Sequence, residues 1–394
     1  MADLRQILSQ GRKRIGVLIG AGAPLSVRVD ATGKLDPNGQ ALIPGVDELT
    51  NQAVAKLTGT EATATAAIRA SLPAGGNIET ILSKVRLLQT ALGDTPKHGL
   101  DGAGYAGLGT AICEAIGEIV GARLPEERTS YHELVSWVGG TQRAHPVEIF
   151  TTNYDLLIES AFERAKAPYF DGFTGGHAPF FDSVTVAGND LPARWSRVWK
   201  LHGSLGWKSD NGVVVRCGGR DCTELVYPDH LKYDLTQKQP YAALFERLKQ
   251  FLLTPDTVLL TSGFSFRDAH ICAVLGETLA MNANAAVIAF QFQPLSDEEP
   301  ARKLAFEHPN LSVYASDAAV IGGVPGPWRP GDLPKNWSEI RASFWGPRGN
   351  NQAFLLGDFA SFCRFCALSY SSDLARAADA VVLAEDAKPA TAEA

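Results

Sequence analysis

The sequence has few cysteines, no long apolar run and no block of basic residues. Six cysteines in 394 residues are too few for the disulfide framework that stabilises small secreted domains. No segment approaches the roughly 20 apolar residues that a membrane-spanning helix needs, and the apolar run before Gly20 is too short for a signal peptide. These absences predict a cytoplasmic protein in a reducing compartment, with no membrane partner.

The charge balance argues against nucleic acid as a partner. The formal net charge is -7 at pH 7, and lysine and arginine are scattered along the chain. A mildly acidic surface does not attract a phosphate backbone. We therefore expect no direct sequence-specific binding of nucleic acid.

Short apolar runs recur along the chain, and the first four end in small or polar residues. The runs occupy residues 15–19, 147–153, 198–203, 257–263, 285–291 and 311–316. Patterns typical of helices fill 154–166, 240–253 and 268–281. This alternation predicts an α/β fold with a doubly wound, Rossmann-like parallel sheet. In such sheets, ligands bind at the carboxyl ends of the strands, where the polar residues collect here.

Residues 48–145 interrupt the alternation with helical patterns at 77–92 and 110–124, joined by a Gly-rich piece at 99–109. We predict a core formed by 1–47 and 146–325, with a helical insertion subdomain at 48–145. The insertion could serve as a lid or as a plain structural module, and the sequence leaves both open.

Later segments are less regular. Residues 204–236 predict a short β-rich excursion, and 322–350 predict an irregular stretch rich in Gly, Pro and Trp. Within the C-terminal segment 326–383, an apolar C-terminal helix is expected at 352–368, for packing on the core or for oligomerisation. The tail at 384–394 has a disordered composition.

The loop "GAGA" at Gly20, Ala21, Gly22 and Ala23 follows the first apolar run. Glycines there let the backbone approach a phosphate closely. The loop lacks the third glycine of a full G-x-G-x-x-G pattern, because Leu25 stands at that position. A nucleotide-binding loop and a tight turn therefore both fit.

The stretch "TTNYD" at 151–155 follows the second run. The amide of Asn153 can orient a hydroxyl or a water molecule, and Asp155 can accept from ribose hydroxyls. The alternative is that Thr152 or Asn153 is the N-cap of the following helix.

The third and fourth runs end in "LHGS" and "TSGFSFRDAH". His202 can act as a general base near neutral pH, although a structural histidine is the commoner case. Ser262, Gly263 and Ser265 could bind ribose or phosphate oxygens. For Arg267 and Asp268, the expectation is a local cap or pair.

Taken together, these motifs resemble the sirtuin-like family: a Gly-Ala-Gly loop, an Asn-x-Asp motif, a His-Gly pair and a Ser-Gly ribose loop occur in that order. The resemblance implies a sirtuin-type fold and NAD as the substrate. It implies catalytic roles for Asn153, Asp155 and His202. The residues expected to bind NAD are Gly20, Ala21, Gly22, Ala23, Ser26, Ser262, Gly263, Ser265 and Ser316.

The cysteines depart from the family pattern. Protein-deacylating sirtuins usually carry two Cys-x-x-Cys pairs that bind zinc. Here Cys217 and Cys222 have a wider spacing, and Cys363 and Cys366 lie far away on an apolar helix. We therefore predict no zinc and no other metal site, and the resemblance to enzymes that bind acetyl-lysine peptides is weakened.

The chain instead resembles bacterial sirtuin-like effectors of anti-phage defence, and residues 225–234 and 238–252 resemble the subset encoded beside HerA-type ATPases. This resemblance implies an NAD glycohydrolase that releases nicotinamide and ADP-ribose and acts by NAD depletion. It also implies a homo-oligomer with a HerA-type hexameric ATPase as partner. An NAD-dependent protein deacylase and a non-catalytic subunit that senses NAD or ADP-ribose are the alternatives.

Overall fold

The fold is described from a computed structural model. The description covers residues 1–9, 12–73, 76–140, 143–211, 213–217, 239–329, 331 and 337–369.

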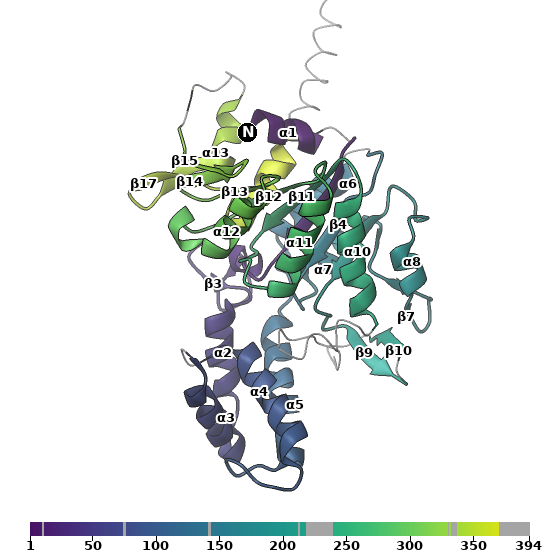
Figure 1. Cartoon of the computed structure of the whole chain (residues 1–394), viewed down its shortest axis with the longest axis vertical. Helices are drawn as coiled ribbons and strands as arrows, with labels where there is room; N and C mark the ends of the chain where they lie inside the picture. Colours follow the sequence, from purple (N-terminus) through teal and green to yellow (C-terminus); the bar gives the residue numbers. More distant parts are fainter. Residues whose placement is uncertain are drawn as a thin grey trace, which may run out of the picture.

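A large twisted sheet forms the centre of the molecule (Figure 1). Across the described ranges it has nine strands in the order β15-β14-β13-β12-β11-β1-β4-β8-β5. The strands are β1 (Arg14–Ile19), β4 (Glu148–Thr151), β5 (Tyr169–Phe170), β8 (Ser196–Lys200), β11 (Thr257–Ser262), β12 (Ala286–Phe290), β13 (Leu311–Tyr314), β14 (Ala318–Ile321) and β15 (Val324–Pro327). The ladders from β13 to β5 are parallel, and only β14 and β15 add antiparallel edges.

The position of β1 defines where a ligand is expected. β1 pairs with β4 on one side and with β11 on the other. The chain thus builds one half of the sheet through β4 and β8, then crosses to the other half through β11, β12 and β13. Such a topological switch point opens a crevice at the carboxyl ends of the strands.

The six apolar runs of the sequence all form strands, which confirms the doubly wound α/β fold. Strands β4, β8 and β11 are buried along their whole length, and β1 is buried after its first residue. Strands covered by helices on both faces are buried in this way.

Helices cover both faces of the sheet. Figure 1 shows α10 and α11 side by side over one face, with α6 and α7 behind them. The helices that surround the sheet are α1 (Ala2–Ser9), α6 (Ser130–Gly140), α7 (Leu157–Arg164), α8 (Ser183–Ala187), α10 (Tyr241–Leu253), α11 (Ala269–Met281) and α12 (Glu299–Glu307). Short 3-10 turns lie at Pro24–Ser26 and Leu295–Asp297.

A bundle of helices projects from the carboxyl edge of the sheet (Figure 1). It consists of α2 (Val46–Ala55), α3 (Gly59–Ser71), α4 (Ile78–Leu92) and α5 (Gly102–Val120). Helix α6, which also falls within the predicted insertion, packs on the sheet domain instead: the Trp137 indole donates to the Leu8 carbonyl at 3.3 Å. The bounds of the insertion subdomain, 48–145, stay a prediction.

The Gly-rich piece at 99–109 was expected to be a linker, and that expectation was wrong from Gly102 onward. The Asp101 side chain caps α5 by accepting from the Gly104 amide at 2.8 Å. A Cβ at Gly102 would lie 2.9 Å from carbonyl oxygens at the end of α4. Gly102 therefore allows α5 to begin close to the end of α4, and this packing outweighs its low helix propensity.

The C-terminal segment is more regular than its composition indicates. It contains α13 (Ser338–Phe344), β16 (Trp345–Arg348) and β17 (Asn351–Phe354), so the expected helix at 352–368 begins only at residue 359. Phe359, Phe362 and Phe365 are completely or almost completely buried on the main core. Of the two roles considered for this helix, packing on the core is the one observed, and the predicted disordered tail lies outside the described residues.

Smaller sheets lie beside the main one. Strands β6 (Phe173–Thr174), β7 (Phe180–Phe181), β10 (Val213–Arg216) and β9 (Trp207–Asp210) form one, and β2 (Arg28–Val29) and β3 (Gln40–Ala41) form another. The predicted β-rich excursion is thus observed in β9 and β10, at Trp207–Asp210 and Val213–Arg216. Its remainder, with residues 225–234 and Cys222, lies outside the described residues.

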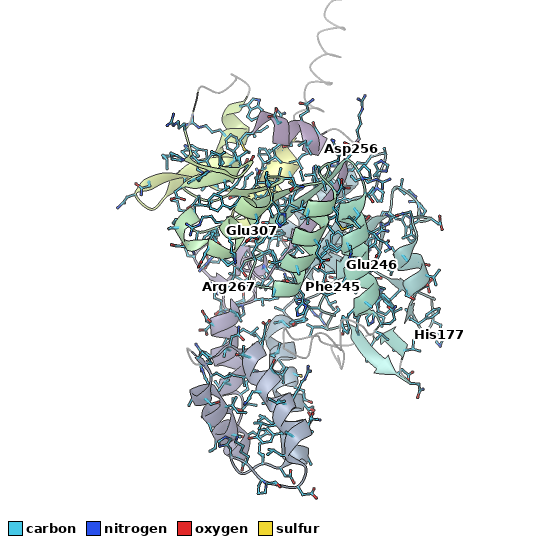
Figure 2. All side chains as sticks on the ribbon, viewed as in Figure 1. His177, Phe245, Glu246, Asp256, Arg267 and Glu307 are labelled. Carbon is cyan, nitrogen blue, oxygen red and sulfur yellow. The ribbon has the colours of Figure 1, made fainter. Side chains whose placement is uncertain are left out.

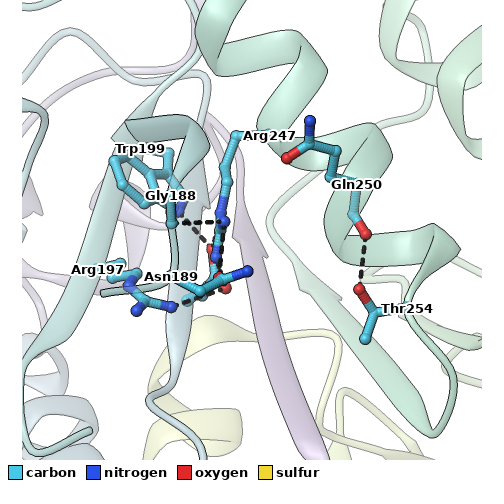
Figure 3. Close-up of polar contacts among 8 residues, drawn as sticks. Gly188, Asn189, Arg197, Trp199, Arg247, Gln250 and Thr254 are labelled. Atoms are coloured by element: carbon cyan, nitrogen blue, oxygen red, sulfur yellow. Dashed lines mark hydrogen bonds and ion pairs between the residues drawn. The ribbon is translucent and has the colours of Figure 1, made fainter. Parts of the chain in front are cut away.

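A buried charged cluster fixes α10 to the amino ends of the strands (Figure 3). The carboxylate of Glu148 accepts from the Arg247 Nε at 2.8 Å and from the Trp199 indole at 2.7 Å, and it pairs with Arg197 at 3.4 Å. Arg247 also donates to the Asn189 side chain at 3.0 Å. These polar contacts therefore hold α10 at the amino ends of the strands, opposite the carboxyl ends where a ligand is expected.

Candidate active site

The four sequence motifs follow four neighbouring strands, in the spatial order β11, β1, β4 and β8. Backbone hydrogen bonds continue past the strand ends. The Gly20 amide donates to the Ser262 carbonyl at 3.1 Å, and the Leu205 amide donates to the Tyr154 carbonyl at 3.0 Å. The motifs are thereby held in one row at the carboxyl edge, where the switch point lies.

The Gly-Ala-Gly loop packs directly against the backbone after β11. A Cβ at Gly20 would lie 2.4 Å from the Gly263 carbonyl oxygen, and a Cβ at Gly22 would lie 2.8 Å from the Gly263 Cα. Gly263 itself has a φ of 67°. The glycines are therefore required by contact between two loops, which accounts for them without a phosphate.

The residues that follow Gly20 in this loop differ in exposure and in their local contacts. Ala21 is exposed and Ala23 is buried. The Ser26 hydroxyl donates to the Ala23 carbonyl at 2.8 Å and lies 3.1 Å from the Ser130 hydroxyl of α6. Ser26 thus connects the loop to α6, and its expected contact with NAD remains a prediction.

Asn153 is buried and its side chain is held in one orientation. Its Nδ2 donates to the Gly20 carbonyl at 3.1 Å, and its amide N–H donates to the Thr151 hydroxyl at 3.1 Å. Within the described residues, its buried Oδ1 has no hydrogen-bond partner. The alternative of an N-cap does not hold for Asn153, because Asp155 accepts from the first amide of α7, that of Leu157, at 3.0 Å.

Asp155 lies in a buried charged group that sequence reasoning missed. The Lys200 ammonium donates to the Asp155 carbonyl and pairs with Glu159 at 3.1 Å. Burial raises the pKa of Asp155 to about 6, against the opposing effects of Lys200 and of the Leu157 amide. An aspartate with this pKa is partly protonated in mildly acidic solution.

His202, which follows β8, lies close to Asp268, which follows β11 in the same sheet. Its Nε2 lies 3.0 Å from Oδ2 of Asp268, and both side chains are about nine-tenths buried or more. The His202 ring stacks on Phe245 of α10, with 6.5 Å between ring centroids. Figure 2 labels Phe245 and Arg267 at the edge facing the helical bundle, and Asp256 at the opposite edge.

The predicted serines differ in position. Ser262 is completely buried, and its Oγ has no partner among the described residues, whereas Ser265 is exposed. Ser316 follows β13, two strands beyond β11, and its carbonyl accepts from Phe354 of β17 at 2.9 Å. The structure therefore does not place Ser316 in the row of four motifs.

A groove of about 660 Å³ lies beside the row but contains neither Asn153 nor His202. Leu156 and Leu205 line it, together with Arg123, Arg164 and Lys166. Its volume is typical of ligand pockets. The residues suited to the reaction belong to the row of motifs. The carboxyl ends of the strands are therefore a better candidate for the reaction than this groove.

No group of three or more His, Cys, Asp or Glu side chains within the described ranges is arranged to hold a metal ion. Cys363 and Cys366 are buried free thiols, and Cys222 lies outside those ranges. In the same part of the chain, no helix is both long and apolar enough to cross a membrane.

Comparison with known proteins agrees with the sequence motifs. The SIR2-like domain family matches residues 147–314, which include the Asn-x-Asp, His-Gly and Ser-Gly-Phe-Ser motifs. No curated protein matches the chain. A solved chain from work on the mechanism and regulation of Sir2 enzymes aligns at 12% identity and a TM-score of 0.32, covering 76% of this chain and 87% of that one.

The chain is thus similar to the SIR2-like domain family over residues 147–314, on a doubly wound α/β sheet. The TM-score of the Sir2 chain is too low to support an argument. The fold is established by the strand order of the sheet. The family match covers less than half of the chain, so the role of the helical bundle stays outside it.

Proposed function

We propose that the protein is an NAD glycohydrolase that cleaves the bond between nicotinamide and ribose. The SIR2-like domain match supports NAD as the substrate. The observation that carries the proposal is the buried Oδ1 of Asn153, which has no hydrogen-bond partner among the described residues while Nδ2 holds the amide in place. Such an acceptor costs free energy unless a ligand or water donates to it.

The reaction needs a nucleophile, a base and stabilisation of a cation-like ribose. Asn153 Oδ1 accepts from a water molecule or a ribose hydroxyl and orients it. The water oxygen forms a bond to C1′ of the ribose, and its proton passes to His202. The C1′–N bond breaks, and its electron pair leaves with the nicotinamide nitrogen, which becomes neutral.

Asp155 contributes negative charge near this centre when it is ionised. Its carboxylate is buried, and a buried charge acts more strongly than an exposed one. The pKa of about 6 means that most of this charge is present at pH 7.5.

Asn153 and His202 are both buried, and the proposal includes a lid that closes over them. The helical bundle of α2 to α5 stands at this edge of the sheet (Figure 1), which favours the lid over the plain module. A site that is closed at rest also suits an enzyme whose activity would exhaust the NAD of its own cell.

We extend the proposal to the biological role. An NADase that is closed at rest fits an anti-phage effector that acts by NAD depletion, in a homo-oligomer licensed by a HerA-type hexameric ATPase. This extension rests on the sequence resemblance, and it predicts that addition of the ATPase raises the rate of NAD cleavage.

The products separate the proposal from its alternatives. Purified protein is incubated with NAD, with and without the ATPase and with and without an acetylated peptide, and the products are resolved by chromatography. We expect nicotinamide and ADP-ribose in equal amounts without peptide. Nicotinamide formed only with peptide, together with an acetylated ADP-ribose, would identify a deacylase, and bound but uncleaved NAD would identify a sensor.

A further inference from the structure

We propose that Lys200 is a positioning residue that acts through Asp155 and keeps its carboxyl ionised for the reaction. The kinetic consequence rests on the proposed function, whereas the effect of Lys200 on Asp155 can be measured without any activity.

Lys200 connects the two strand ends that carry the proposed catalytic residues. It is the last residue of β8, two residues before His202, and it lies opposite Thr151 at the end of β4. Its ammonium reaches the start of α7, where it donates to the Asp155 carbonyl and pairs with Glu159 at 3.1 Å. The Lys200 side chain is only 1% exposed. One buried cation therefore holds the segment that follows β4 against β8.

The burial of this ion pair is costly, so its presence needs a reason. Lysine is almost never fully buried unless it is paired, and a buried ion pair is often no more stable than two apolar side chains of similar volume. Lys200 provides the counter-charge of Glu159, whose second oxygen, Oε2, is buried without a hydrogen-bond partner among the described residues. Stability alone therefore does not account for the pair.

Groups from β8, α7 and α6 act on the Asp155 carboxyl. Burial raises its pKa to about 6, and the Lys200 charge is the largest opposing effect, ahead of the hydrogen bond from the Leu157 amide. The negative charge of Glu159 raises the same pKa, because like charges disfavour each other. Tyr131 of α6 interacts with both carboxylates, and burial raises the pKa of its phenol well above the ordinary value, so Tyr131 stays uncharged. Lys200 is thus the cation with the largest effect in favour of ionised Asp155.

Two variants should shift the titration of Asp155 in opposite directions. Lys200→Met/Glu159→Gln removes the pair as a unit, so neither partner is left as a buried charge without the other. It removes the larger attraction together with the smaller repulsion, and we expect Asp155 to titrate about one pH unit higher. Glu159→Gln removes only the repulsion, while its amide oxygen can still accept from Lys200, and Asp155 should titrate lower. The matched control is Lys249→Met/Glu277→Gln, which removes the same two charges from a partly exposed pair between α10 and α11.

The spectroscopic arm needs no turnover. Protein with ¹³C-labelled aspartate is titrated with acid and base, and the Cγ signal of Asp155, identified by its loss in Asp155→Asn, reports the protonation of the carboxyl. We expect a midpoint of about 6 in the wild type and the same midpoint in the control. The midpoint should be higher in Lys200→Met/Glu159→Gln and lower in Glu159→Gln. Equal midpoints in all of these proteins, or shifts of both variants in the same direction, would overturn the proposal.

The kinetic arm measures kcat for nicotinamide release against pH. Ionised Asp155 is the active form, so kcat falls on the acid side as the carboxyl takes up a proton. The ratio of the kcat of the control to that of Lys200→Met/Glu159→Gln should decrease about tenfold between pH 5 and pH 9, because one pH unit is a factor of ten in the ionised fraction on the acid side. A ratio that does not change with pH would show a merely structural role and overturn the proposal. The expected titration shifts in a protein that releases no nicotinamide would uphold the effect of Lys200 on Asp155 while the proposed function fails.

Discussion

Asp155→Asn should stabilise the protein at neutral pH while it abolishes activity. The pKa of Asp155 rises from its ordinary value of 3.8 to about 6 in the folded protein, chiefly because the carboxyl is buried. The folded state therefore holds this proton more tightly than the unfolded state does. The stability that the proton provides is present below pH 4 and is lost as the pH rises towards 6.

The magnitude follows from the two pKa values. A difference of about two pH units corresponds to a cost of about 3 kcal/mol at pH 7.5, where the wild type must keep a buried carboxylate ionised. Asparagine resembles the protonated form and can still accept from the Leu157 amide. We therefore expect the free energy of unfolding to rise by up to about 3 kcal/mol at pH 7.5 and by about half as much at pH 5.

Urea unfolding of both proteins at several pH values is the assay. The gain must shrink as the pH falls, because the wild-type carboxyl becomes protonated. A variant that is less stable than the wild type at pH 7.5, or a difference that does not change with pH, would refute the reasoning. The former result would mean that attraction to Lys200 outweighs the cost of burial.

Two further predictions concern stability. Glu148→Gln leaves Arg197 and Arg247 buried without their counter-charge and should lower the free energy of unfolding by about 3–5 kcal/mol, whereas Asp256→Asn, in the exposed pair with Lys13, should change nothing measurable. Equal effects in urea unfolding would contradict the structural role of the buried cluster. Gly322→Ala should cost about 1 kcal/mol, because φ is 59° there and nothing lies within 4 Å. Gly263→Ala should cost about 1–3 kcal/mol more, because its Cβ would also meet the Ala23 amide nitrogen at 2.6 Å. Thermal unfolding with equal losses for both alanines would show that the two loops do not pack as described.

The strands were predictable because buried parallel strands leave an unambiguous apolar pattern. The row of motifs at one edge also followed, since parallel strands end on the same side. Residues 99–109 were misread because local propensity favours a linker there, whereas the close approach of α5 to the end of α4 at Gly102 suits a helix that begins with glycine.

The side-chain contacts of the candidate site could not be predicted from the sequence as readily as the strands. Asp268 shows a capping pattern locally, and its approach to His202 depends on α11 beginning beside the end of β8. Lys200 and Glu159 belong to separate elements that only the folded sheet brings together. Ser316 follows β13, which lies two strands beyond β11 in the sheet, and its expected contact with NAD stays a prediction.

The central claim is tested most directly by nicotinamide release from NAD by the purified protein, with and without the proposed HerA-type ATPase, beside Asn153→Ala and His202→Ala. The control is His177→Ala, because His177 is exposed and is labelled well away from Phe245 in Figure 2. We expect both site variants to lose at least about 10²-fold in rate and the control to keep the wild-type rate. Equal release by all four proteins would contradict a reaction at the ends of β4 and β8.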